Sequence, residues 1–517
     1  MTAPSGIATG ARPSPPTQAE LQEQRSEPLP HLPALDGVRG LALVGIILFH
    51  GGFTWAKGGF LGVSTFFTLS GFLITNLLVR EFEGTGNIAL LRFWGRRLGR
   101  LVRAWLLTIA LIGLVWWRIG TPEQVGALRG DMLFALGYVA NWHLWSTGIS
   151  YGSLFSSPSP FQHFWSLAVE EQFYLLFPII TLVLMRVGGR RLLAIACALG
   201  CAGSIMLMWL MRDEFDRIYY GTDTRIAEIL FGVILAIWWS SRRRNSTTPT
   251  KVEPLFDLAA ALALLLIFSA WITVHESSPS LAQGGFPAYA GLSTVVIYTS
   301  TRGGVFARVL ATPALRWIGL LSYGLYLYHW PVFLVLSPER TGLGLGPLFI
   351  IRMIVTTALA IASYQFLEMP VRRRTRFRST RTAATAALTG ILKVAICAVA
   401  VTIDPPKSTI PYANMKITDL GIRSGALSPT VTPTNGAKPV TAWIIGDSGA
   451  MDASPALAAA MEATGSKSFI FGAGPGFGLT TGIDWRKDWS AAIAENRPDV
   501  AIVMLGSWDL PYIRENG

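Results

Sequence analysis

The stretch LDGVRGLALVGIILFH, residues 35–50, is apolar enough for a membrane helix, yet it contains Arg39 and ends in His50. Eleven positions make about three helical turns, so the two side chains lie on nearly the same face, about 16 Å apart along the axis. Ionisable side chains inside a span are costly and by default face the protein interior. A guanidinium suits a phosphate-bearing ligand, and a neutral imidazole can deprotonate a hydroxyl or help to transfer an acyl group. The alternative is that Arg39 is a cytoplasmic anchor and His50 a snorkelling interfacial residue.

The composition excludes an ordinary soluble enzyme. Of the 517 residues, 51% are hydrophobic and 14% are charged, which is typical of a polytopic membrane protein. The net charge of +12 comes from short basic clusters between apolar runs, as in RFWGRRLGRLVR and RRRTRFR. This is the positive-inside pattern, not a continuous basic face for nucleic acid. The three cysteines lie in apolar runs and indicate neither a disulfide framework nor a zinc site, and no metal-ligand spacing is present.

Several apolar runs have the length of membrane spans. They lie at about 37–54, 60–80, 101–118, 164–186, 191–211, 223–240, 256–274, 286–300, 317–336, 346–367 and 384–402. Basic residues concentrate in alternate loops, which predicts a cytoplasmic N-terminus and an extracytoplasmic C-terminal segment. Residues 128–146 are a rival span. If this segment crossed the membrane, the basic clusters that follow it would lie on the extracytoplasmic side, against the positive-inside rule. We therefore interpret it as an outer interfacial or re-entrant segment.

The chain is predicted to contain five segments. Residues 1–34, rich in Pro, Ser, Gln and Glu, form a disordered cytoplasmic tail without a cleaved signal peptide. Residues 35–375 form an α-helical membrane domain of ten spans, and 376–403 form an eleventh transmembrane helix. Residues 404–440 are an extracytoplasmic linker. In 441–517, short buried-strand patterns alternate with a helical pattern, which indicates the start of an α/β domain.

Six further motifs follow the Arg39–His50 pattern in a fixed order. They are GGFLGVSTFFTLSGFLIT, FWGRRLGRLVR, FQHFWSLAVEEQFYLLFPI, YYGTDTRIAEILFG, LRWIGLLSYGLYLYHWPV and SYQFLEMPVRRR. Together they resemble the acyltransferase 3 family of membrane O-acyltransferases, over about residues 34–375. The family acylates extracytoplasmic sugars such as peptidoglycan and lipopolysaccharide O-antigen.

The resemblance implies a multi-pass enzyme of the bacterial inner membrane. It would transfer an acyl group, acetyl in the first instance, from cytosolic acyl-CoA to a hydroxyl of an extracytoplasmic glycan or glycolipid. Acyl-CoA would be a co-substrate, with no bound cofactor, metal or nucleic acid. In the family pattern, Arg39 and His50 match the pair held to be essential for acyl transfer. The basic cluster after the second span matches Arg96, Arg97 and Arg100.

Two carboxylates, Glu170 and Glu171, follow HFWSLAV inside a predicted span. A carboxylate at such a position is expensive, so at least one of them should have a partner, an arginine or His163. A structural ion pair is favoured over a catalytic role.

Further secondary candidates are Asp223, Arg225, Tyr326 and His329. Asp223 and Arg225, in GTDTR, are expected at the outer mouth, where they would contact a sugar acceptor or cap the sixth span. Ser322, Tyr326 and His329 follow an i, i+4, i+7 spacing, which places them on one helix face. A histidine on such a face is more often a core residue than a catalyst.

The C-terminal segment has its own motif. GDS at 446–448 follows a strand pattern and resembles the opening block of an SGNH hydrolase-like domain, with Asp447 and Ser448 as its remnant. A serine needs an adjacent base to attack an ester, and the last histidine of the chain is His329. We therefore predict that Ser448 has no independent catalytic triad here, whether the domain is truncated or degenerate.

A transporter or exporter of a glycolipid or small molecule is the alternative, because many spans and interior polar residues fit that class as well. It would predict internal repeats between the two halves, and no convincing repeat is found. The acceptor, acyl chain length, oligomeric state and route of the acyl group across the membrane stay open.

Overall fold

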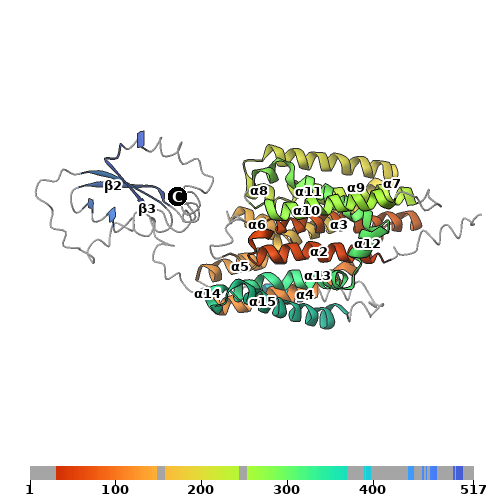
Figure 1. The fold of residues 1–517 in the computed structure, drawn as a ribbon, viewed down its shortest axis with the longest axis horizontal. Coiled ribbons are helices and arrows are strands. Elements are labelled where there is room, and N and C mark those ends of the chain that lie inside the picture. Colours follow the sequence, from red (N-terminus) through yellow and green to blue (C-terminus); the bar gives the residue numbers. More distant parts are fainter. Residues whose placement is uncertain are drawn as a thin grey trace, which may run out of the picture. The chain divides into compact units, whose positions relative to one another are not determined.

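The computed structural model describes residues 31–120, 122–147, 158–243, 253–276 and 278–369. It also describes short pieces at 389–390, 392–396, 440–446, 457–458, 461–462, 466–473, 493–494 and 497–504. The chain divides into two units, Met1–Pro405 and Pro406–Gly517. The first unit is helical, and the second contains a small sheet (Figure 1).

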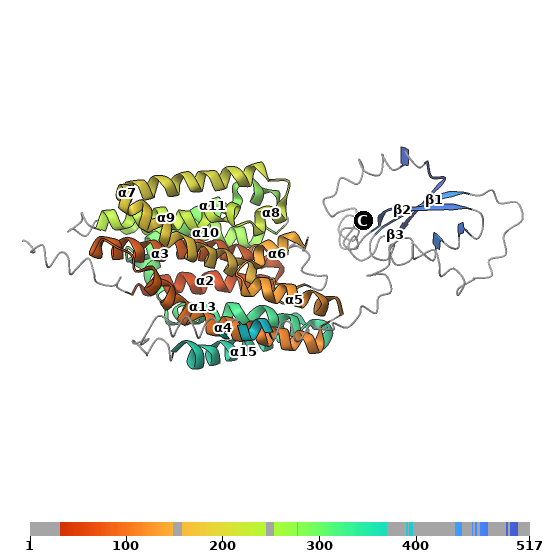
Figure 2. The same ribbon diagram turned by 180° about the vertical axis from the view of Figure 1, so that it is seen from behind.

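The described helices of the first unit pack side by side, as Figure 2 shows from behind. In chain order they are α2 (Pro33–His50), η1 (Thr54–Ala56), η2 (Gly59–Leu61), α3 (Gly62–Thr85), α4 (Leu90–Ile119), α5 (Pro122–Leu136), α6 (Ala140–Ser146), α7 (Phe164–Leu210), α8 (Phe215–Tyr220), α9 (Thr222–Arg243), α10 (Glu253–Thr273), η4 (Leu281–Gly285), α11 (Phe286–Ser300), α12 (Gly304–Leu310), α13 (Pro313–Val335), α14 (Pro338–Thr341), α15 (Leu345–Ser363) and η5 (Tyr364–Glu368).

Within the described ranges, eight helices are long and apolar enough to cross a membrane by length and composition. One of them, α7, has 47 residues and contains two predicted spans, 164–186 and 191–211, with non-helical backbone at Gly189 (φ 63°) between them. The predicted run 286–300 is helix α11, but with 15 residues it is shorter than a full span. Most of 384–402 lies outside the described residues. The polytopic α-helical fold is thus confirmed, while the total of eleven spans stays a prediction.

The segment 128–146 is not one of the eight candidate spans. It folds into the end of α5 and the short helix α6, separated by a break at Tyr138, whose φ is 55°. Non-glycine residues seldom adopt positive φ, so this residue marks a sharp change of direction. The interpretation of this segment as non-spanning agrees with the structure.

Helix α2 packs closely against α13 because glycines line their contact. A Cβ atom on Gly319 would lie 1.8 Å from the carbonyl oxygen of Asp36, and one on Gly40 would lie 2.3 Å from that of Leu315. Small residues let membrane helices approach to backbone contact. This contact brings the helix that carries Arg39 and His50 against α13.

Replacing Gly319 with alanine is therefore expected to push α2 and α13 apart. We expect a loss of about 1–3 kcal/mol of unfolding free energy, the usual cost of overpacking, measurable by thermal unfolding in nanodiscs. Gly203, a helical glycine of α7 with open space around it, is the matched control. Gly203→Ala should leave stability unchanged or raise it by up to about 1 kcal/mol. Equal effects of the two substitutions would contradict this account of the α2–α13 contact.

The second unit contains a parallel sheet of β1 (Thr441–Gly446), β2 (Lys467–Ala473) and β3 (Val500–Met504), in the order β2-β1-β3. Ile444 of the central strand pairs with Ile470 on one side and Ile502 on the other. Parallel neighbours require crossover connections, as in α/β domains. The three predicted strands are confirmed. Asp447 and Ser448 lie outside the described residues, so the likeness to an SGNH domain stays a prediction.

Candidate active site

A cavity of about 290 Å³ lies among α2, α3, α4, α7 and α13. Its polar lining contains three cations, two carboxylates and several hydroxyls, which come from separate parts of the chain: Arg39, Ser70, Arg96, Arg97, Ser166, Glu170, Glu171, Tyr174, Ser322, Tyr323 and Tyr326. The structure thus brings together candidates that the sequence shows in four different motifs. The side chain of Arg100 is outside the described part of the structure.

Arg39 is the most unusual of these residues. Within the part of the chain that the structure describes, its guanidinium makes no hydrogen bond or ion pair, and its Nε atom is buried without a hydrogen-bond partner. Glu170 faces the same cavity, and the two opposite charges interact through space. Arg39 also borders a second cavity of about 230 Å³ beside Asp36 and Phe72. Among the described residues, the guanidinium of Arg39 therefore keeps hydrogen-bond donors that can bind an anion at the cavity.

The other two arginines are held at the cavity wall by different contacts. The guanidinium of Arg97 lies over the ring of Tyr174, 3.9 Å from its centroid, in a cation–π contact. Arg96 is half exposed, with a nitrogen 4.0 Å from a carboxylate oxygen of Glu81. Neither contact uses all five N–H donors of the guanidinium group, so both side chains can bind an anion at the cavity.

Glu170 has a different direct partner from the one expected. The Ser70 hydroxyl donates to its carboxylate at 2.7 Å, and the Tyr174 hydroxyl donates to Ser70 at 2.8 Å. His163 instead contacts the carbonyl of Leu327. Among the described residues no ion pair joins Glu170 or Glu171 to an arginine. The direct partner of Glu170 is the Ser70 hydroxyl, and Arg39 and Arg97 act on its carboxylate through space.

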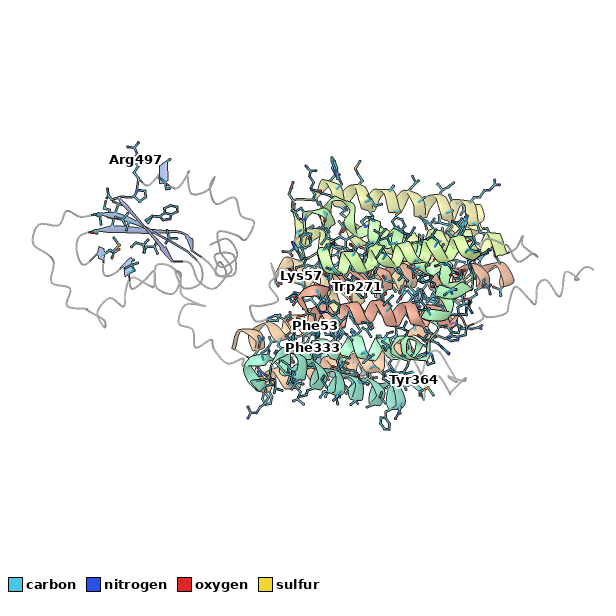
Figure 3. All side chains as sticks on the ribbon, in the orientation of Figure 1. Phe53, Lys57, Trp271, Phe333, Tyr364 and Arg497 are labelled. Atoms are coloured by element: carbon cyan, nitrogen blue, oxygen red, sulfur yellow. The ribbon has the colours of Figure 1, made fainter. Side chains whose placement is uncertain are left out.

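His50 and His329 meet across the α2–α13 contact. His50 Nδ1 lies 3.1 Å from His329 Nε2, and the ring centroids are 5.0 Å apart. The ring of Trp330 packs against His50 at 4.9 Å. Phe333, labelled in Figure 3, lies 5.9 Å beyond His329 between ring centroids. Aromatic rings therefore pack against both histidines of the pair.

Tyr326 connects the cavity to this histidine pair. It lines the cavity, its hydroxyl is 2.6 Å from that of Ser166, and its backbone carbonyl is 2.6 Å from Nδ1 of His329. The side chains of His50 and His329 are not part of the cavity wall. His329 lies beside Tyr326, with the ring centroids 5.3 Å apart, and His50 lies next to His329.

The remaining two candidates do not form a common site. Asp223 accepts two hydrogen bonds from Arg217, at 2.8 and 2.6 Å. Arg225 is 1% exposed and pairs with Glu228 at 2.7 Å. The expectation that Arg225 lies at an outer mouth is wrong, because its side chain is enclosed between helices.

The geometry can be compared with known proteins. A family model described as an acyltransferase domain matches residues 32–365, which include the whole cavity and both histidines. The chain belongs to this acyltransferase family.

Several named O-acetyltransferases are similar to this chain. It is 35% identical over 352 residues to peptidoglycan O-acetyltransferase OatA of Listeria monocytogenes, covering 66% of this chain and 56% of the relative. It is 36% identical over 358 residues to the putative peptidoglycan O-acetyltransferase YrhL of Bacillus subtilis, covering 68% and 56%. For O-acetyltransferase OatA of Staphylococcus aureus the identity is 35%, covering 66% and 58%. The acyltransferase chain thus spans a little over half the length of these relatives. No solved structure matches it.

Sequence reasoning did not include Ser70 and Tyr174 among the site residues. Ser70, in TLSGF, is interpreted from the sequence as a close-packing point between helices, with a direct role as the alternative, and no sequence pattern singles out Tyr174. The sequence does not predict that they contact each other, because Ser70 is on α3, Tyr174 is on α7, and they meet only where these two helices pack together.

Proposed function

We propose that this chain is an integral membrane O-acyltransferase that moves an acetyl group from cytosolic acetyl-CoA to a hydroxyl of an extracytoplasmic glycan. The observation that carries this proposal is Arg39, a half-buried residue whose guanidinium has no direct partner among the described residues and which borders a cavity together with Arg96 and Arg97. Guanidinium groups recognise phosphates by bidentate hydrogen bonds, and the CoA moiety has several phosphate groups. The family relationship supports acyl transfer as the reaction.

In the proposed reaction, the three arginines bind the phosphates, and the thioester arm extends past Ser166 and Tyr326 to His50, which lies beyond the cavity wall. His50 removes the proton of the acceptor hydroxyl as its oxygen attacks the thioester carbonyl carbon. The carbon–sulfur bond then breaks, and the proton returns from His50 to the thiolate. The products are the acetylated glycan and CoA thiol, so the step balances without a further reactant.

A peptidoglycan-type glycan is the acceptor class that the named relatives support. The basic loops support a cytoplasmic N-terminus and thus a cytoplasmic position for the Arg39 end of α2. His50, at the opposite end of α2, is then closer to the extracytoplasmic side. In a bacterium this arrangement corresponds to the inner, or plasma, membrane.

The first experiment uses inverted membrane vesicles that contain the full chain or its His50→Ala variant. Acetyl-CoA labelled on the acetyl group is added, and label is followed into protein, lipid and glycan fractions. We expect transfer to fall by about 10²-fold or more in His50→Ala, as is usual for loss of a general base. The control is His275→Ala, at an exposed histidine after α10, which should transfer normally. Equal labelling by His50→Ala and the wild type would contradict the proposal, and an unlabelled glycan exported by the wild type would favour a transporter.

A further inference from the structure

We propose that His329 is a positioning residue that fixes the tautomer of His50 and stabilises its protonated form. The inference rests on the proposed function, in which His50 is the base. In Ser-His-Asp sites a buried carboxylate orients the catalytic imidazole by accepting from its Nδ1–H. Here a second imidazole occupies the place of that carboxylate.

The tautomer of His329 follows from its own helix. Its Nδ1 lies 2.6 Å from the backbone carbonyl oxygen of Tyr326, three residues earlier in α13. A carbonyl oxygen can only accept a hydrogen bond, so Nδ1 must carry the proton. In the neutral ring, the lone pair is then on Nε2.

The tautomer of His50 follows from that of His329. His329 Nε2 faces His50 Nδ1 at 3.1 Å, and a lone pair there requires a donor from the other ring. His50 therefore carries its proton on Nδ1, and its basic nitrogen is Nε2. The ring of His50 also has a hydrogen bond to the backbone of Ile46, one turn earlier in α2, so His329 and Ile46 orient it together. When Nε2 takes a proton, the Nδ1–H of the imidazolium still donates to His329, which makes that hydrogen bond charge-assisted and stronger.

The position of His329 is set by several contacts of α13. Pro331 lies inside this helix and has no N–H, so the carbonyl of Leu327 lacks its usual helical donor. His163 Nε2 lies 3.1 Å from that oxygen and takes the donor's place. The pairing fixes α13 to the start of α7, and the glycine contact with α2 fixes its other side. His329 itself is 0% exposed, so it has little freedom to leave His50.

A neutral partner suits a base inside a membrane better than a carboxylate would. An anion at position 329 would add a charge to the span interior, which is expensive. A carboxylate would also favour the charged form of His50 much more strongly than a neutral imidazole does, and a His50 that is already an imidazolium cannot accept the proton of the acceptor hydroxyl. The second imidazole orients His50 without this cost.

The experiment compares three variants of the full chain in nanodiscs: His329→Gln, His329→Asn and His329→Ala. The amide of glutamine reaches the position of Nε2 and can accept from His50, whereas the shorter asparagine amide reaches only the position of Nδ1. We expect His329→Gln to keep kcat within about tenfold of wild type. His329→Asn and His329→Ala should lose roughly 10²-fold or more, the range for loss of general-base function. KM for acetyl-CoA should not change in any of them, because His329 is outside the cavity wall.

Thermal unfolding of each variant shows whether it has folded. Rescue by glutamine but not by asparagine, at equal stability, would support the positioning role, since a packing role does not distinguish the two amides in this way. Equal kcat values for the glutamine and asparagine variants would overturn it. So would a fully active His329→Ala when His50→Ala is inactive, and in that case the proposed function would stand. Full activity of His50→Ala would overturn the proposed function itself.

Discussion

Arg39→Met is expected to weaken acetyl-CoA binding while making the empty protein more stable. Each charge-assisted hydrogen bond to a ligand contributes about 1.5–3 kcal/mol. Losing the paired N–H donors of the guanidinium should therefore raise KM for acetyl-CoA by roughly 10–100-fold. In the empty protein, Arg39 is a cation without a direct partner among the described groups. An apolar side chain of similar length removes that penalty, and we expect a gain of about 1 kcal/mol. Initial rates against acetyl-CoA concentration and thermal unfolding in nanodiscs measure the two effects.

Two control variants make this result specific. Arg39→Lys keeps the charge but loses the planar fork, so its KM should fall between wild type and Arg39→Met. Arg308→Met, at an exposed arginine of α12, should change neither KM nor stability. A loss of stability in Arg39→Met would show that Arg39 is a structural anchor, as in the alternative interpretation of the sequence.

The second large effect is expected at the buried ion pair of Arg225 and Glu228. Their side chains are 2% and 0% exposed, and the guanidinium lies 3.7 Å from the ring centroid of Phe286. The rings of Trp165 and Tyr219 are also close, at 5.3 and 5.2 Å. Glu228→Leu would leave a buried cation without its counter-charge, which usually costs about 3–5 kcal/mol. We expect a comparable loss for Arg225→Met.

The double variant Arg225→Met/Glu228→Leu distinguishes a structural pair from a functional one. Replacing both charges by apolar groups is often neutral or stabilising, so most of the lost stability should return. Thermal unfolding of the four proteins forms a double-mutant cycle with a large coupling energy. Losses that simply add would mean that each charge is stabilised by other groups. Recovered stability without recovered acyl transfer would show that the pair also serves the reaction.

The sequence alone determined the features that depend on local pattern. Hydropathy marks most of the helices that are apolar enough to span, and helical periodicity places Arg39 and His50 on a common face. In the structure Arg39 lines a cavity to which α13 contributes, and His50 contacts His329 of α13. The three strands of the C-terminal unit are short apolar runs bounded by glycine or polar residues, which is also a local signal. The family resemblance, spread over several motifs, is confirmed by the match to residues 32–365.

Only the tertiary structure decided which of these residues meet. His50 and His329 are 279 residues apart in sequence, and Ser70 and Glu170 are 100 apart. No periodicity within one helix predicts such contacts, because they depend on which faces of separate helices pack together. The glycine contact between α2 and α13 decides the first pair, and the packing of α3 against α7 decides the second. Arg225 is a second example. Its position in the sequence predicts a place at the outer end of a helix, but the neighbouring helices bury its side chain. A buried guanidinium requires a counter-charge, which Glu228 provides.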